Sequence, residues 1–312
     1  MRLALVVLAG CSFRHGELAN SDAPEVDPHL DAAVDGAVSN CYARWFDHSV
    51  RFGAPQPLSV NTTGYERDPF LTADEQTLYF SAIRGATPED VYFATRTGTG
   101  FASFTTAQPF TDVNSSGGET KLSLTANGLV AVVGSTRGGG SGGVDVWETS
   151  RMTTATAFPS PTRDKVMAIE TSANEHDPTI SADGLHLYFA PDLGAQHIEL
   201  VTRATVNDNF AAPAPLPELT SGTGDADPSP TPDERIIMFS SNRALAGAMP
   251  SNIWYATRGA KTMPFEAPIA VPDINSDFPE GDPHLSSDGC RIYFARYSGA
   301  GLDWNLYVAA MQ

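Results

Sequence analysis

The sequence has 312 residues, with 19 Lys and Arg against 37 Asp and Glu, which gives a formal net charge of −18. This charge excludes duplex nucleic acid as a partner, because a phosphate backbone is bound by a basic protein face. Hydrophobic residues make up 41% of the chain, which also contains 27 Gly and 23 Pro. The composition provides a core and many turns, and it excludes a disordered, collagen-like or polytopic membrane protein.

The N-terminus carries a targeting pattern. Arg2 precedes a short apolar run, and small residues stand directly before Cys11. This pattern resembles a bacterial lipoprotein signal with its lipobox. The resemblance implies that residues 1–10 are removed as a signal peptide and that acylated Cys11 anchors the chain to a membrane. An ordinary secretory signal or a wrongly chosen start codon is the alternative.

The residues after Cys11 show neither a helical nor a strand period. They are rich in acidic residues, Ala, Ser and Pro, so residues 11–44 are expected to form a flexible acidic tether carrying the lipid. Ser12 favours the outer membrane by analogy with enteric bacteria. The expected location is therefore the cell envelope, on the periplasmic or surface face of the outer membrane, with the lipid anchor as the only membrane contact.

Five segments repeat one pattern at intervals of roughly 53 residues. Each segment predicts a short strand, a tight turn rich in Asp, Asn or Gly, a second strand with aromatic residues, and a third strand after a polar loop. Phe and Pro positions beyond it indicate a fourth strand at the sheet edge. Four strands in a unit of this length are typical of a propeller blade. The repeats begin at Glu66, Gly118, Glu175, Asp225 and Glu280.

The fifth unit ends at its third strand, whereas residues 50–58 resemble an isolated fourth strand. We therefore predict an all-β, five-bladed propeller over residues 45–312, closed by an N-terminal strand that completes the last blade. Six blades are the alternative. This closure brings Cys41 beside the blade that holds Cys290, which favours a disulfide between them in an oxidising compartment. Two unpaired thiols are the alternative.

The repeat has the form acidic-x-Asp-Pro-x-[Leu/Ile]-[Ser/Thr]-x-Asp-Gly, then Tyr-Phe, then Asp-[Ile/Val]-[Tyr/Trp]-x-x-x-Arg. It resembles the TolB-like, WD-like β-propeller repeat of bacterial envelope proteins, and this resemblance implies protein–protein interaction. The second unit departs from it, with Lys121-Leu122 in place of Asp-Pro, which puts in doubt any role that needs a complete ring of aspartates. TolB itself has six blades and a separate domain.

The acidic residues that open the units are expected near the inner strands, at one mouth of the central channel. In five-bladed glycoside hydrolases, carboxylates from different blades act as acid and base. We favour a structural role, in which Asp accepts backbone N–H bonds and Arg84, Arg137 and Arg243 pair with carboxylates from blade to blade. A Ca²⁺ ion or a basic peptide is a further alternative. The candidates are Glu66, Asp68, Glu119, Glu175, Asp177, Asp225, Asp227, Glu280 and Asp282.

The histidines and cysteines lack the spacing of a zinc site, so we assign no metal, no cofactor and no catalytic residue. The leading functional hypothesis is a non-enzymatic, lipid-anchored, monomeric envelope propeller. It would bind an envelope protein or peptide, or a glycan, through its loop faces or channel mouth. The alternative is an extracytoplasmic carbohydrate-active enzyme, a glycoside hydrolase that uses the channel carboxylates.

Overall fold

The computed structural model describes residues 41–85, 88–245, 251–299 and 303–312. The expected signal peptide, the lipidation of Cys11 and the tether as far as residue 40 lie outside the described residues. The chain from Ser39 to Gln312 groups into one compact unit. Among the described residues, no helix has the length and apolar character needed to cross a bilayer.

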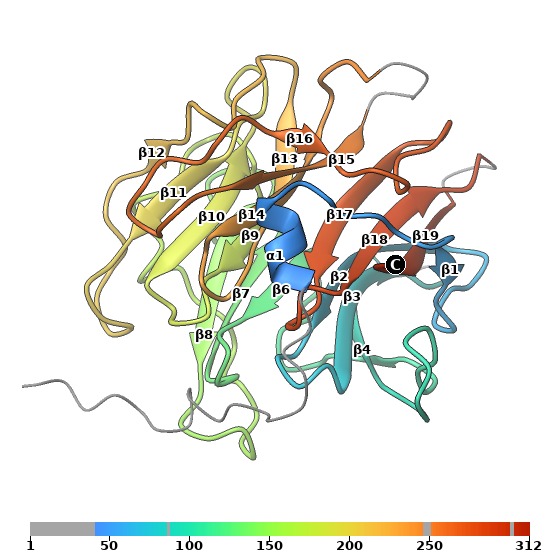
Figure 1. Cartoon of the computed structure of the whole chain (residues 1–312). Helices are drawn as coiled ribbons and strands as arrows, with labels where there is room; N and C mark the ends of the chain where they lie inside the picture. The colour runs from blue at the N-terminus through green and yellow to red at the C-terminus, as the bar shows by residue number, and fades with distance from the viewer. Residues whose placement is uncertain (1–40, 86–87, 246–250, 300–302) are drawn as a thin grey trace, which may run out of the picture. The chain divides into compact units, whose positions relative to one another are not determined.

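The described chain forms five antiparallel sheets, which confirms the prediction of an all-β, five-bladed propeller (Figure 1). The first strands of successive blades contact one another in a closed cycle, and they surround the channel. The strands are β2 (Tyr65–Leu71), β3 (Thr77–Ile83), β4 (Asp90–Thr95) and β5 (Gln108–Pro109) in blade one; β6 (Glu119–Leu124), β7 (Val130–Ser135) and β8 (Asp145–Ser150) in blade two; β9 (Glu175–Ile180), β10 (His186–Pro191), β11 (Glu199–Thr202) and β12 (Ala214–Pro215) in blade three; β13 (Asp225–Pro230), β14 (Ile236–Ser241), β15 (Asn252–Thr257) and β16 (Ile269–Ala270) in blade four; and β17 (Glu280–Leu285), β18 (Arg291–Tyr297), β19 (Trp304–Ala310) and β1 (Gln56–Pro57) in blade five.

The hairpin between the first two strands of each blade is built by its polar turn residues. In blade one, Asp74 Oδ1 accepts the backbone N–H of Gln76 at 3.0 Å and the hydroxyl of Thr72 at 2.5 Å. Glu75, the next residue along the turn, has a φ of 55°. The equivalent residue is Gly128 in blade two, with a φ of 67°, where glycine relieves the strain of this conformation. The turn sequence therefore determines where each hairpin reverses.

Blade two differs from the other blades because its fourth strand is missing. A single bridge between Glu148 and Thr162 stands at the place of this strand. This bridge has two backbone hydrogen bonds, from Glu148 N–H to the carbonyl of Thr162 and from Thr162 N–H to the carbonyl of Glu148, each 2.8 Å long.

The N-terminal strand closes the ring as predicted. In β1, Gln56 pairs with Val308 and Pro57 pairs with Tyr307 of β19, which makes β1 the fourth strand of blade five. A further bridge joins Phe52 to Met311. The first and last parts of the described chain are therefore held in one sheet.

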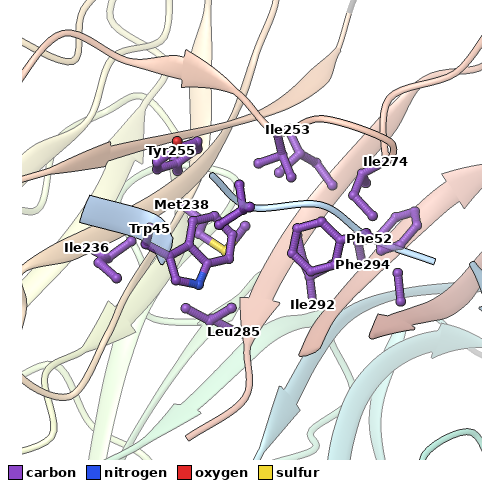
Figure 2. Packing of buried hydrophobic residues seen from close by; sticks show 13 residues of the cluster. Trp45, Phe52, Ile236, Met238, Ile253, Tyr255, Ile274, Leu285, Ile292 and Phe294 are labelled. Atoms are coloured by element: carbon purple, nitrogen blue, oxygen red, sulfur yellow. The ribbon is translucent and has the colours of Figure 1, made fainter. Parts of the chain in front are cut away.

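A short helix, α1 (Cys41–Phe46), precedes this strand. It contains residues 41–44, which were assigned to the tether, and it is joined to blade five by a disulfide between Cys41 and Cys290, with Cα atoms 5.2 Å apart. Trp45 is 0% exposed and lies 4.9 Å from the ring of Tyr255 in an edge-to-face contact (Figure 2). Its indole N–H donates to the carbonyl of Gly289 at 2.9 Å. Apolar burial, a hydrogen bond and a covalent link thus fix the N-terminal segment to the propeller.

Candidate functional site

A bulge in the first strand of every blade turns one side chain toward the channel. The strand register shifts at this point in all five blades. The residue at the bulge has a φ between 44° and 57°. Aspartate tolerates this left-handed region better than most residues, and the proline that follows in four blades has no N–H to lose. The five residues are Asp68, Lys121, Asp177, Asp227 and Asp282; we call the four acidic ones the aspartate ring.

The aspartate ring links neighbouring blades through backbone hydrogen bonds. Asp68 Oδ2 accepts the N–H of Lys121 at 3.1 Å. Asp177 Oδ2 accepts the N–H of Asp227 at 3.4 Å, and Asp227 Oδ2 accepts that of Asp282 at 3.2 Å. The structural role expected from the sequence is therefore present. It does not use all the acceptors, because Asp68 Oδ1 is buried without a hydrogen-bond partner.

The carboxyl groups of the aspartate ring differ in their preference for a proton. Burial, followed by the charges of Asp227 and Asp68, raises the pKa of Asp177 and of Asp282 well above the ordinary value. Burial also opposes ionisation of Asp227. Its pKa is nevertheless lowered, by the charge of Lys121 and by hydrogen bonds from Asp282, Ser240 and Asp177. The environment of the ring therefore favours the protonated form of Asp177 and Asp282 and the ionised form of Asp227.

The remaining acidic candidates form a second set, which we call the collar. Each collar carboxylate accepts the backbone N–H and the hydroxyl of a Ser or Thr four residues upstream. None of them lines either of the two cavities described below. Of the nine candidate carboxylates, only Asp177 and Asp227 line one of these cavities. The collar consists of Glu66, Glu119, Glu175, Asp225 and Glu280.

Four collar carboxylates pair with an arginine of the same blade. Pairing with an arginine of the neighbouring blade was expected from the sequence. The reason is the register: Asp225 lies opposite Ser241, so Arg243, two residues further on, can reach back to it. The paired atoms are Arg84 Nη2 and Glu66 Oε1 at 3.7 Å, Arg137 Nη2 and Glu119 Oε1 at 3.3 Å, Arg243 Nη2 and Asp225 Oδ1 at 2.9 Å, and Arg296 Nε and Glu280 Oε1 at 2.7 Å.

Glu175 is the exception in the collar. It lies opposite Pro191, and Leu193 stands where the other blades have their arginine. The side chain is 0% exposed, and its Oε2 atom has no hydrogen-bond partner. Burial, reinforced by the charge of Asp145, raises the pKa of Glu175 to about 7.

We predict that Glu175 causes the free energy of unfolding of the protein to fall as the pH rises. Its pKa is about 7 in the folded protein, against an ordinary value of 4.5 for glutamate. Protonated Glu175 therefore favours the folded state at low pH. As the pH rises from the unfolded pKa through the folded pKa, the free energy of unfolding falls by about 3 kcal/mol. Glu175→Gln should remove this contribution and be more stable than the wild type at pH 8 by a similar amount. Urea unfolding of both proteins between pH 4.5 and 8 measures the difference.

The matched control for this prediction is Glu119→Gln, at the same position in blade two. Glu119 has the Arg137 partner that Glu175 lacks. Glu119→Gln should therefore destabilise the protein at pH 8. If both substitutions act in the same direction, the missing arginine does not set the behaviour of Glu175.

Two cavities lie along the channel. The polar cavity has a volume of about 260 Å³ and is lined by two members of the aspartate ring, Asp177 and Asp227, together with Arg67, His176, Ser240 and Asn242 among others. The apolar cavity, of about 440 Å³, is lined by residues that follow the bulges, such as Phe70, Ile180, Pro230 and His284. The polar cavity is thus lined by two carboxyl groups whose pKa values are shifted in opposite directions.

Sequence reasoning missed the basic residues of the polar cavity. Arg67 precedes Asp68 in β2, and its guanidinium binds Glu89 through two bonds of 2.8 and 3.1 Å. His176 precedes Asp177, and its Nε2 lies 3.0 Å from Asp192 Oδ2. Their position directly before an aspartate of the ring could have indicated these residues. The residue type at this position differs between the repeats, so the pattern did not single them out.

No family model matches the sequence, and no curated protein matches it. Among solved structures, the catalytic domain of a family-62 α-L-arabinofuranosidase from Coprinopsis cinerea aligns with a TM-score of 0.58 at 10% identity, covering 84% of this chain and 97% of that one. A thermostable family-43 glycoside hydrolase aligns with a TM-score of 0.57 at 12% identity, covering 82% and 95%. A putative TolB from Agrobacterium tumefaciens gives 0.46 at 15% identity, covering 80% and 81%.

These comparisons correct the leading functional hypothesis. The resemblance to TolB holds for the β-propeller fold, but the TolB structures align with TM-scores below 0.5. The glycoside hydrolases align better, and carboxyl groups from several blades meet in the channel. The hypothesis of a non-enzymatic binding propeller was therefore wrong, and the glycoside hydrolase alternative is better supported. At these identities the matches themselves show a shared β-propeller fold.

Proposed function

We propose that the chain is a glycoside hydrolase that binds its glycan in the polar cavity. One observation carries the proposal: Asp177 and Asp227 line the same cavity, and their environments move their pKa values in opposite directions. A pair of carboxyl groups separated in this way provides one proton donor and one anion, which is what cleavage of a glycosidic bond needs.

The roles follow from the directions of the two pKa shifts. The environment of Asp177 favours its protonated form, so we assign it as the general acid toward the leaving oxygen. The environment of Asp227 favours its ionised form, so we assign it as the base that takes a proton from the attacking water, or as the nucleophile that attacks the anomeric carbon itself. The uncharged polar groups of Ser240 and Asn242 are suited to binding sugar hydroxyls.

The substrate class is proposed from the solved structures that share the fold. They include α-L-arabinofuranosidases from Coprinopsis cinerea and Podospora anserina and an arabinanase from Bacillus subtilis. We therefore propose L-arabinofuranosyl glycans as the first substrates to examine. The cavity volume of about 260 Å³ suits a terminal sugar rather than a long stretch of polymer.

The full-length chain should release reducing sugar from at least one member of a panel of arabinan, arabinoxylan, xyloglucan and 4-nitrophenyl glycosides of arabinofuranose and xylose. Asp164→Asn is the matched control, because Asp164 is an exposed aspartate that does not line the polar cavity. This variant should retain full activity. The absence of release from the whole panel by folded protein would contradict the proposal.

A further inference from the structure

Lys121 is the only residue at the five bulge positions that is not acidic. It stands in β6 at the place taken by aspartate in the other four blades, with a φ of 44°. The residue is only 4% exposed, and its Nζ atom has no hydrogen-bond partner among the described residues. A buried ammonium without a bonded partner is costly, so a compensating interaction has to come from its surroundings.

The surroundings of Lys121 are strongly acidic. Burial alone would lower its pKa, but the charges of the aspartate ring raise it above the ordinary value. The same ammonium lowers the pKa of Asp227. The other charged group that acts on the ring is Arg67, whose guanidinium lies 3.6 Å from Asp68 and lowers the pKa of Asp177 and Asp282. Lys121 therefore stays charged although it is buried, and its charge favours the ionised form of Asp227.

His284, which lies in β17 just after Asp282, responds to the same charge. Burial, followed by the charge of Lys121, lowers the pKa of His284 to about 3. Its Nε2 accepts the backbone N–H of Leu71 at 3.2 Å, as a neutral imidazole can. His284 is therefore neutral at neutral pH and adds no positive charge to that of Lys121.

The geometry of the ring also suits a metal ion. Asp68, Asp227 and Asp282 each offer an oxygen, and these atoms lie within 4.8 Å of one another. A cluster of carboxylates at this spacing usually needs a cation to offset its mutual repulsion. In this chain Lys121 already brings a positive charge to the ring, and that charge repels a second cation.

We propose that Lys121 is a positioning residue whose ammonium acts as the fixed internal cation of the aspartate ring, in place of a metal ion, and keeps Asp227 ionised. The electrostatic part of this inference concerns the ring alone. Its catalytic consequence, an anion ready to act on the sugar, rests on the proposed function.

The test compares the full-length wild type with Lys121→Met, Lys121→Asp and Lys121→Arg. Thermal unfolding is measured in EDTA and in about 10 mM Ca²⁺. The wild type and Lys121→Arg should melt at the same temperature in both. Lys121→Met and Lys121→Asp should melt lower in EDTA and gain about 5 °C or more with Ca²⁺, because binding of the ion to the folded state stabilises it.

A spectroscopic measurement separates an electrostatic role from a merely structural one. Infrared spectra of the wild type at pH 7 should contain a protonated-carboxyl band that is weakened by Asp177→Asn and by Asp282→Asn. Lys121→Met should add protonated carboxyl at this pH, because Asp227 loses its stabilising charge, and Lys121→Arg should not. If Lys121→Met is unfolded in EDTA and folds when Ca²⁺ is added, that result also supports the proposal.

Two results would overturn the inference. One is a wild type that gains stability from Ca²⁺ and loses this gain with Asp227→Asn, since the ring would then depend on a metal ion. The other is a set of Lys121 variants with neither Ca²⁺ dependence nor a changed carboxyl band. Neither measurement uses glycan, so failure of the proposed hydrolysis leaves this inference standing, and the reverse also holds.

Discussion

Replacing Asp227 with asparagine should lower kcat/KM for glycan hydrolysis by about 1,000-fold, the scale of a lost acid–base or nucleophilic group. Asparagine has nearly the same shape, and its amide oxygen can still accept the N–H of Asp282 that Asp227 accepts at 3.2 Å. The loss should therefore lie in kcat, and the variant should fold with a lower melting temperature, because the buried ammonium of Lys121 loses the charge of Asp227. Steady-state kinetics on the most active substrate of the panel, together with thermal unfolding, measure both quantities.

Asp177→Asn should show a different kinetic signature. A general acid matters less when the leaving group is a weakly basic phenol. The variant should therefore lose much more activity on a natural glycan than on a 4-nitrophenyl glycoside, and the alkaline limb of its pH profile, which reports loss of the proton donor, should change. Equal losses on the two kinds of substrate would contradict the assignment of Asp177 as the proton donor.

Removing the disulfide should be the most destabilising change outside the site. Cys41 and Cys290 are separated by 249 residues in the sequence. In the chain-entropy model, removing a disulfide that closes a loop of this length lowers the free energy of unfolding by about 5 kcal/mol, because the unfolded chain gains conformational entropy. The double variant Cys41→Ser with Cys290→Ser should show this loss in equilibrium unfolding by guanidinium chloride.

The reductant provides the control for this prediction. Dithiothreitol should destabilise the wild type and leave the double variant unchanged. Trp45 and the pairing of β1 with β19 remain in both proteins, so the variant should still fold at room temperature. A wild type that is insensitive to dithiothreitol, and as stable as the variant, would contradict the expected role of the disulfide.

The sequence allowed the propeller to be predicted because its repeat encodes local structure five times. Turn residues such as Asp74 define each hairpin, and the truncated fifth unit indicated the strand that β1 provides. The loss of the fourth strand in blade two was not predicted. The repeat does not reveal this loss, because the segment before Thr162 also contains Phe and Pro, at Phe158 and Pro161.

The site was predicted less well than the fold. All nine candidate carboxylates lie in the first strands of their blades, but the repeat does not show which of them line a cavity. A left-handed bulge separates Asp68 from Glu66, although residues two apart normally share one face of a strand. Lys121 was noticed as a departure from the repeat. Its role could not be assigned, because the charges that surround it come from blades distant in the sequence.

The central claim is that the polar cavity cleaves a glycosidic bond with carboxyl groups of the aspartate ring. Real-time ¹H NMR of an arabino-oligosaccharide incubated with the full-length chain tests it most directly, since the anomeric signals identify both the bond that is cleaved and the new reducing end. The account predicts a new anomeric signal that grows with the wild type and with Asp164→Asn, and that does not grow with Asp227→Asn. Growth of the signal at the same rate with Asp227→Asn would contradict the claim.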